Sequence, residues 1–184
     1  MVQSMQHFRL DRIPDNLLRD PLQFLIADHV RQRKICNALD ALVHGTERAE
    51  TGDTTAAILT YLVRDLPLHI SDEEIDLFPA LQRADGFDDE MTKLIDALKR
   101  DHATALSLAQ NVMTFFREER SPFADSAIVE PLARLFGAFT DCVRGQVAIE
   151  DRILIPLARK RLSDADLDRI GRAMAARRDI DYPD

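Results

Sequence analysis

The sequence predicts an all-α fold, namely an up-down four-helix bundle built from two similar helical hairpins, with a short extra C-terminal helix. Tyr and Trp, which favour strands, account for only two of the 184 residues, whereas residues that favour helices are abundant. Apolar residues recur at helical spacing in four long stretches separated by polar segments. The first pair of stretches also shares its motifs with the second pair. These patterns are typical of a four-helix bundle.

The first hairpin begins with a helix predicted for residues 20–43, whose inward-facing stripe includes His29. The polar linker HGTERAETGD follows, and a second helix is predicted for residues 54–83. Pro67 lies inside this second helix. Because proline removes one backbone hydrogen bond, we expect a bend just before His69.

The second hairpin repeats this arrangement. A helix is predicted around residues 91–113, with His102 on its apolar stripe, and a long helix for residues 126–161 follows the polar break SPFAD. The last segment opens with Ser163 and Asp166 in the arrangement of a capping box, which predicts a short, mostly solvated helix. The predicted organisation is therefore an N-terminal leader at 1–19, the four-helix bundle at 20–161, and a C-terminal helix and tail at 162–184.

Charge and composition exclude several classes of function. The net charge is −8 and the isoelectric point is near 5.1, so we expect neither nucleic acid nor an anionic membrane as a partner. Cations are the more natural ligands. The start of the chain carries no secretion signal and no stretch is apolar enough to span a membrane, so a cytoplasmic location is predicted. Cys36 and Cys142 are isolated, which indicates reduced, packed thiols.

The chain contains an internal repeat. HISDEEIDLFPAL, which starts at His69, is echoed by QVAIEDRILIPLA, which starts at Gln146. In both copies a glutamate follows four residues after the first residue and a proline follows ten residues after it. The first helix of each hairpin also carries an Asp-His pair, at Asp28-His29 and Asp101-His102. Two copies of one hairpin would build a bundle with approximate twofold symmetry.

The repeat places six polar residues in one layer of the bundle. Residues four apart on a helix share a face, with Cβ atoms roughly 5–6 Å apart, so His69 and Glu73 can reach the same point. Such a buried cluster is costly without a partner, whereas metal ions neutralise carboxylates and accept imidazole nitrogens. Mixed nitrogen and oxygen donors favour iron, with manganese as an alternative, over structural zinc, which more often recruits cysteine. The predicted ligands are His29, His69, Glu73, His102, Gln146 and Glu150.

Ordinary structural explanations compete with this hypothesis. A single histidine such as His102 on an apolar face is more often a hydrogen-bonded core residue, and an isolated HxxxE pair is normally a surface pair. The repetition of both features favours metal. Other chemistries lack their motifs, since the chain has no Gly-rich phosphate loop, GxSxG or HExxH, and no Glu-x-x-His of a ferritin-like oxidase precedes its helical histidines.

Several neighbours of the predicted ligands need their own assignment. We expect Asp72, Glu74 and Asp151 to be solvated, with the alternative that one of them is a further carboxylate ligand. Asp65 and Cys142 each lie one turn before a predicted ligand. We expect Asp65 to be an acid that supports the site from outside or is exposed, and Cys142 to pack in the core.

These residues resemble the hemerythrin-like, or HHE cation-binding, domain family. The matching elements occur in order over residues 20–161, and they are His29, HISDE followed by LFP, Asp101-His102, and QVAIE followed by LIP. The resemblance implies an up-down four-helix bundle with a non-haem di-iron centre of two ions per chain. It implies ligands at His29, His69 and Glu73 in the first hairpin and at His102 and Glu150 in the second.

Gln146 departs from the family pattern, which usually has histidine at this position. An amide oxygen coordinates more weakly than an imidazole and carries no charge, so we expect the second metal position to be weak.

The resemblance implies a protein that binds or senses iron, oxygen or a related diatomic ligand such as NO. Reversible oxygen carriage is less favoured, because oxygen-carrying hemerythrins supply further histidines. This chain has five in all, and His7 and His44 lie in the leader and near a helix end. Two alternatives stay open. One is a peroxide-consuming, iron-dependent oxidoreductase that uses the same residues, and the other is a helical interaction scaffold with weakened metal binding.

Overall fold

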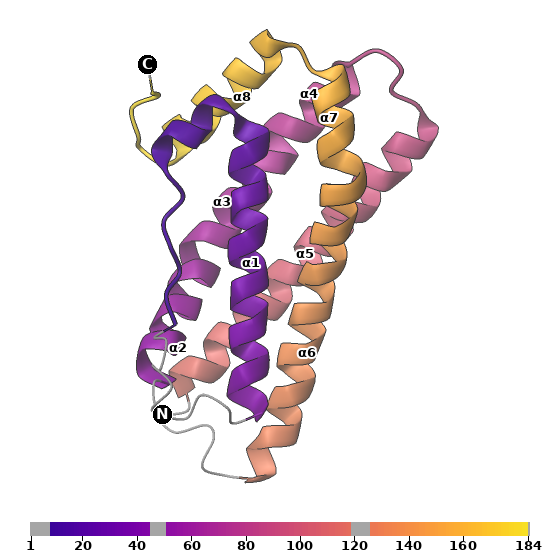
Figure 1. Cartoon of the computed structure of the whole chain (residues 1–184). Helices are drawn as coiled ribbons and strands as arrows, with labels where there is room; N and C mark the ends of the chain where they lie inside the picture. Colours follow the sequence, from indigo (N-terminus) through magenta and orange to yellow (C-terminus); the bar gives the residue numbers. More distant parts are fainter. Residues whose placement is uncertain (1–7, 45–50, 119–125, 184) are drawn as a thin grey trace, which may run out of the picture.

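The structure is a computed structural model that describes residues 8–44, 51–118 and 126–183. These residues form helices joined by short connections and contain no strand, so the all-α prediction is confirmed (Figure 1). The α-helices are α1 (Pro21–His44), α2 (Thr51–Thr60), α3 (Leu66–Ser71), α4 (Phe78–Arg83), α5 (Asp89–Glu118), α6 (Ser126–Ile149), α7 (Ile155–Arg161) and α8 (Asp164–Arg177). The other elements are the 3-10 helix η1 (Asp15–Arg19) and the π-helical segments η2 (Tyr61–Asp65), η3 (Asp72–Leu77) and η4 (Glu150–Leu154).

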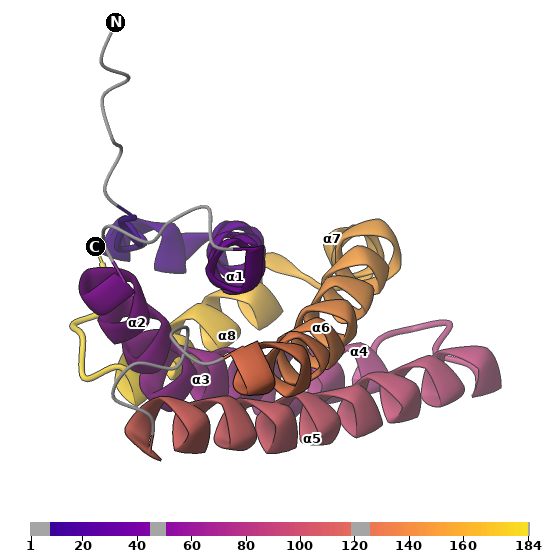
Figure 2. The same cartoon turned by 90° about the horizontal axis from the view of Figure 1, so that it is seen from below.

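The helices enclose a common interior. Helix α6 packs against both α1 and α5, while α2 packs against α1 and α3 packs against α5. Viewed from below, α6 lies between α1 and α5 (Figure 2). Helix α8 crosses the upper end, where it contacts η1, α1 and η3 (Figure 1). These contacts close a ring of helices around the core.

The predicted helices agree with the structure to within a few residues. The second helical run begins at Thr51, three residues before the predicted start, and continues through η2, α3, η3 and α4 to Arg83. The fourth run extends from Ser126 to Arg161 as predicted. The break SPFAD and most of the linker HGTERAETGD fall outside the described residues.

Three π-helical segments interrupt the α-helices, and each ends two residues before a proline. Segment η2 precedes Pro67, η3 precedes Pro79 and η4 precedes Pro156. A proline ring has no N–H and clashes with the carbonyl four residues earlier, and a widened turn relieves both problems. The distortion expected before His69 is therefore present as a widened turn. Glu73 and Glu150 lie inside two of these segments.

Two apolar clusters fill the interior, one on each side of a polar layer. The upper cluster includes Leu25 and residues of α8, and the lower cluster includes Ile35. Along α1, Leu25 belongs to the upper cluster and Ile35 to the lower one, with Asp28, His29 and Gln32 buried between them. The other three helical runs change cluster at the same level. The flanking apolar pairs and the polar residues between them are Leu98 and Ala105 around His102, Ile70 and Leu77 around Asp72 and Glu73, and Val147 and Leu154 around Glu150.

Helix α8 is mostly exposed or partly exposed, as expected, but one face attaches it to the bundle. The predicted capping box is present, because the Ser163 hydroxyl accepts from the backbone N–H of Asp166 and the Asp166 carboxylate accepts from the backbone N–H of Ser163. One face of the helix is buried and packs into the upper cluster. Gly171 on this face lies so close to η1 that an added Cβ would stand 2.1 Å from the Leu18 carbonyl oxygen. No other residue fits there without moving the backbone.

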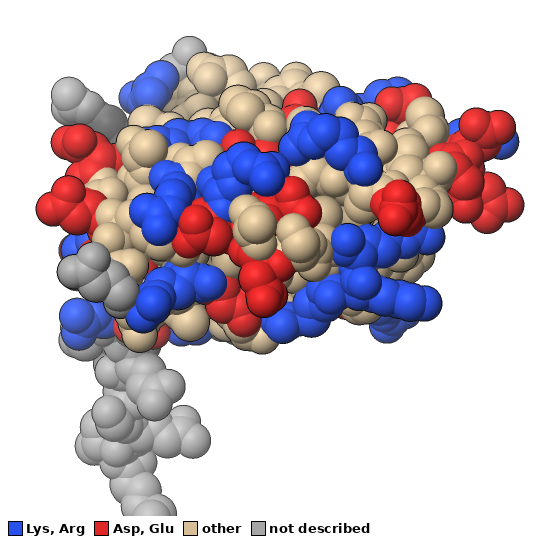
Figure 3. All heavy atoms as spheres, turned by 90° about the horizontal axis from the view of Figure 1, so that it is seen from above, with Lys and Arg blue, Asp and Glu red and all other residues tan. Residues whose placement is uncertain are grey.

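Positive and negative side chains are interspersed over the upper face of the molecule (Figure 3). Several belong to ion pairs within α8, such as Arg169 with Asp166 and Arg172 with Asp168. Among the described residues, no helix has the length and apolarity needed to cross a membrane. The cytoplasmic location remains a prediction from the sequence.

Candidate metal centre

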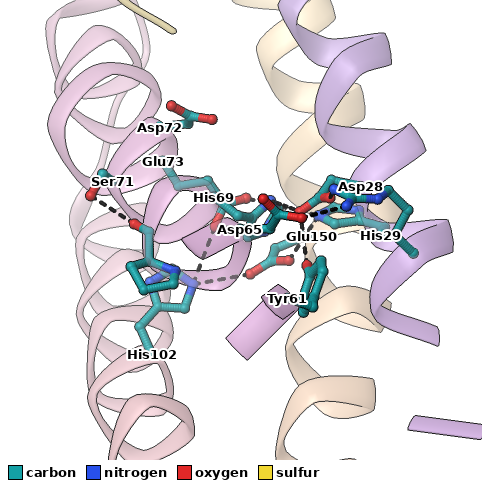
Figure 4. Close-up of polar contacts among 12 residues, drawn as sticks. Asp28, His29, Tyr61, Asp65, His69, Ser71, Asp72, Glu73, His102 and Glu150 are labelled. Atoms are coloured by element: carbon teal, nitrogen blue, oxygen red, sulfur yellow. Dashed lines mark hydrogen bonds and ion pairs between the residues drawn. The ribbon is translucent and has the colours of Figure 1, made fainter. Parts of the chain in front are cut away.

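Four of the six predicted ligands converge in the polar layer. His29 from α1, His69 from α3, Glu73 from η3 and Glu150 from η4 each offer one donor atom, and these atoms all lie within 4.8 Å of one another. All four side chains are buried. The Nε2 atom of His29 lies 3.2 Å from Glu150 Oε2, and His69 Nε2 lies 3.7 Å from Glu73 Oε2. Figure 4 shows these groups pointing toward one another from different helices.

His102 reaches the same layer from α5. Its Nε2 atom lies 3.2 Å from Glu73 Oε2 and 3.4 Å from Glu150 Oε1, so it faces both central carboxylates. Its ring stacks on Phe78, with ring centroids 5.9 Å apart. Five of the six residues singled out by the sequence are thereby placed around one point.

Gln146 has a different environment. The side chain is buried, but its amide nitrogen donates to the Cys142 sulfur at 3.6 Å, and the Cys142 thiol donates to the Asp101 carbonyl oxygen at 3.6 Å. The expectation that Cys142 lies near the core holds, since its side chain is partly buried. The amide group of Gln146 is thus tied to α5 through a thiol.

Each of the three imidazoles has a carboxylate beside its second ring nitrogen. His29 Nδ1 lies 2.6 Å from Asp151, and His102 Nδ1 lies 2.9 Å from Glu74. His69 Nδ1 lies 3.3 Å from Asp28. At His29 and His102 the carboxylate is hydrogen-bonded to Nδ1, which fixes the ring and leaves Nε2 as the free donor, the usual support for a metal-binding histidine. His69 Nδ1 lies near Asp28 but makes no hydrogen bond. All three Nε2 atoms therefore face the central pair of glutamates.

This arrangement corrects the expectation that Glu74 and Asp151 are simply solvated. Both are about one-third exposed, yet each contacts an imidazole at its inner end. Asp28 was not assigned a role from the sequence. The signal was present, because Asp28 precedes His29 in the repeated Asp-His pair, but helical spacing does not show that it would serve His69 in another helix.

Asp28 is itself held from two sides. The Tyr61 hydroxyl donates to Asp28 Oδ2 at 2.9 Å (Figure 4). Arg31 donates to Asp28 Oδ1 at 2.7 Å. Arg31 also pairs with Asp65, which is partly buried and stands one step further from the centre. Of the three carboxylates beside the imidazoles, Asp28 is the only one that is fully enclosed.

Asp72 contradicts the sequence-based expectation most clearly. It was expected to be solvated, but its side chain is fully buried and pairs with Arg177 and Arg178 at the end of α8. Figure 4 shows its carboxylate turned away from Glu73. The prediction failed because the partners lie more than a hundred residues away in the sequence.

The imidazoles differ in how strongly they hold a proton. Burial disfavours the charged form of His29, but its contacts with Asp151 and Glu150 outweigh burial and raise its pKa to about 10. The same balance, with the two central glutamates as partners, raises the pKa of His102 to about 10. Burial dominates at His69, where the neighbouring imidazoles reinforce it, and the pKa falls well below its usual value. In the absence of metal, His69 is thus the neutral member of the set.

The two central carboxylates, Glu73 and Glu150, also differ in pKa. Burial raises the pKa of Glu73 to about 7, and the charge of Glu150 adds to the effect. At Glu150 the nearby imidazoles of His102 and His29 outweigh burial and lower the pKa. In the metal-free protein the protonated rings of His29 and His102 therefore balance the charge of these carboxylates, a role that a metal ion would take over.

The site contains buried polar atoms that the protein leaves without hydrogen bonds. Both carboxylate oxygens of Glu73 and the Nε2 atom of His29 are enclosed and have no hydrogen-bond partner. Leaving such atoms unpaired costs about 1–3 kcal/mol each, and more for a charged group. A cation that binds imidazole nitrogens and carboxylate oxygens together would satisfy all three atoms. The residues present therefore fit a metal ion.

Comparison with known proteins agrees with this geometry. A protein of Haemophilus influenzae described only as uncharacterized is 28% identical to this chain over 172 residues, which cover 88% of this chain and 91% of that protein. The sequence profile of the hemerythrin HHE cation binding domain matches residues 20–158, a region that includes every helix contributing to the polar layer. The chain therefore belongs to the hemerythrin HHE cation binding domain family.

Proposed function

We propose that this protein is a non-haem iron-binding hemerythrin-like protein that binds or senses iron, oxygen or a related diatomic ligand. The observation that carries the proposal is the enclosed group of His29, His69, Glu73 and Glu150, whose donor atoms lie within 4.8 Å of one another. Two imidazoles and two carboxylates form a mixed nitrogen and oxygen set that suits iron or manganese better than a closed zinc site.

The proposed first metal position takes His29 and His69 from the first hairpin, with Glu73 and Glu150 shared between two positions. The second position takes His102 and, in the family pattern, the residue at Gln146. The amide of Gln146 donates to Cys142, so the side chain would have to turn to offer its oxygen. We propose one tightly held ion and a second, weaker one, within an up-down order of the four helical runs.

The surroundings favour a small neutral ligand at the metal. Bound iron would supply an open coordination position for a diatomic molecule, because four protein donors leave part of a six-coordinate shell free. The apolar clusters on both sides of the polar layer exclude bulk water and charged molecules. Asp151 and Glu74 hold the rings of His29 and His102 by hydrogen bonds, so that these two imidazoles need not rearrange when a ligand arrives.

Metal content of anaerobically purified protein tests the proposal directly. We expect elemental analysis to find iron at one to two ions per chain, and titration of the metal-free protein with Fe(II) to show one tight and one weak step. Glu73→Ala should abolish the tight step. Glu130→Ala, which removes an exposed carboxylate on α6, is the matched control and should bind as the wild type does. Protein without bound metal, or equal binding by both variants, would contradict the proposal.

Exposure of the loaded protein to different reagents separates the roles that the sequence left open. A binding or sensing protein should change its visible absorption with O2 or NO and consume no peroxide. Steady consumption of peroxide would instead establish the oxidoreductase alternative. A chain that binds no iron and gives no absorption change would be a helical scaffold.

A further inference from the structure

Helix α8 lies outside the region that matches the family profile, which ends at residue 158. Its final turn nevertheless reaches the element that carries a central carboxylate. Arg178 Nη1 donates to Asp72 at 3.0 Å, and its Nη2 and Arg177 also pair with Asp72. Arg177 pairs in addition with Asp76 at 2.5 Å. Both acids belong to η3, so the end of α8 forms ion pairs with this segment at two positions about one turn apart.

The residue after Asp72 is Glu73, and the two are joined by one peptide bond. A bidentate grip on Asp72 therefore fixes the rotation of η3 about its axis, and with it the direction in which Glu73 points. This external support matters because η3 is a π-helical segment, whose hydrogen bonds define its rotation less firmly than those of an α-helix. Figure 4 shows Asp72 and Glu73 leaving the segment in different directions.

Attachment of α8 does not require these ion pairs. Ile170, Met174 and Ala175 already bury the helix in the upper cluster, and Gly171 lets it approach η1 closely. The two arginines instead line a cavity of about 1180 Å³ and are partly exposed. The arginines neutralise the fully buried Asp72, and buried ion pairs add little net stability compared with apolar packing.

We propose that Arg177 and Arg178 are positioning residues for the metal site, which hold Glu73 in place through Asp72. Helix α8 is then a functional part of the centre and not only an addition to the bundle. This inference rests on the proposed function, because it concerns the orientation of a carboxylate toward a metal ion.

Co(II) binding to the metal-free protein provides the test, because the visible spectrum of Co(II) reports the geometry of its ligands. Arg177→Gln combined with Arg178→Gln should weaken Co(II) binding by about tenfold and shift the absorption bands, since support from outside the ligand set commonly changes affinity by roughly 10- to 100-fold. The single variant Arg178→Lys keeps the positive charge but loses the planar guanidinium group. It should bind Co(II) more tightly than the double variant does. It also serves as the test variant if the double variant does not fold.

Two controls separate positioning from stability. Arg169→Gln with Arg172→Gln removes the same charge from the exposed face of α8 and should leave affinity and spectrum unchanged. Ile170→Ala should lower the melting temperature but leave the spectrum of the folded protein as in the wild type. Wild-type affinity and spectrum in the Arg177 and Arg178 variants would overturn the inference, as would an equal spectral shift in Ile170→Ala. A wild-type protein that binds neither Co(II) nor Fe(II) would overturn the proposed function itself.

Discussion

The two hairpins reach the polar layer with unequal sets of donors. The first supplies His29, His69 and Glu73, whose donor atoms gather with Glu150 within 4.8 Å. The second supplies His102 and Glu150 in matching positions, but the amide of Gln146 is bound to the Cys142 sulfur. The two hairpins are therefore more alike in their sequence motifs than in the metal-binding groups that they supply.

The supports behind the donors are unequal as well. Asp28, behind His69, is enclosed and held by Tyr61 and Arg31. Glu74, behind His102, is about one-third exposed. Water can replace an exposed carboxylate but not an enclosed one, so the acid beside His69 is harder to replace than the acid beside His102.

The largest expected effect on metal affinity comes from removing one imidazole from the first hairpin, compared with removing one from the second hairpin in a separate variant. An apparent binding free energy of about 10–16 kcal/mol shared among four ligands corresponds to roughly 3 kcal/mol per ligand, or about 100-fold in affinity. We expect His69→Ala to weaken the tight ion by about that factor, and His102→Ala to weaken it much less. Chelator competition with Fe(II) measures both. Equal losses in the two variants would remove the distinction between the hairpins.

Acidification should empty both positions, the second one first. The raised pKa values of His29 and His102, about 10 in the metal-free protein, mean that these rings hold a proton at neutral pH, and the metal must displace it. Affinity then rises with pH up to about 10 and falls by about tenfold per unit, for each displaced proton, as pH decreases below that value. Fe(II) titrations at pH 8 and pH 6 should differ by at least about 100-fold at the tight position, because Glu73, whose pKa is about 7, also holds a proton at pH 6.

Proton release offers an independent check on the same prediction. Metal binding in a weakly buffered solution at pH 7.5 should release about one proton per ion. An affinity that does not change between pH 8 and pH 6 would show that neither His29 nor His102 binds the metal.

Matched Asp→Asn substitutions compare an enclosed support with an exposed one. Asp28→Asn should weaken the tight ion by about 10- to 100-fold, because nothing can replace the enclosed carboxylate beside His69. Asp151→Asn should weaken it by less than tenfold, since the side chain at this position is partly exposed and water can satisfy the polar atoms of the new amide. The measurement is chelator competition on protein whose folding has been checked by circular dichroism. A larger loss for Asp151→Asn would contradict the ranking by burial.

The variant that adds an imidazole at position 146 should change the affinity of the tight metal position least. Its effect should fall on the weak position. Gln146→His supplies a ring at the same helical position, and we expect about tenfold slower loss of the second ion during dialysis against a mild chelator. Gln146→Leu is the control, because it removes the amide without adding a donor. Identical loss from Gln146→His and the wild type would mean that this position does not face the metal.

Much of the architecture follows from local patterns in the sequence. The extents of the four helical runs and the inward direction of His29 and His102 follow from apolar periodicity, because a helix repeats every 3.6 residues whatever it packs against. The pairing of Ser163 with Asp166 is likewise a local matter, since both partners lie within one turn. The HxxxE motif at His69 and its QxxxE counterpart at Gln146 were enough to point to Glu73 and Glu150 as central carboxylates.

The roles of the neighbouring acids could not be read in the same way. Asp72, Glu73 and Glu74 are consecutive, and a rotation of about 100° per residue decides which one faces inward. Helical spacing does not show which distant side chains these acids meet, so it gave no partner for Asp72 and missed the contact of Glu74 with His102.

The sequence by itself determined the all-helical fold, because this depends on periodicity within each helix, and the motifs repeated between the hairpins carried the family resemblance and pointed to the central residues. Only the tertiary structure decided which carboxylate supports which imidazole, that Arg177 and Arg178 hold Asp72, and that Gln146 is bound to Cys142. His29 and Asp151 are 122 residues apart, and no local rule relates them. Such pairs form only when helices pack, since burial makes an unpaired charge costly and selects the partner that packing brings within reach.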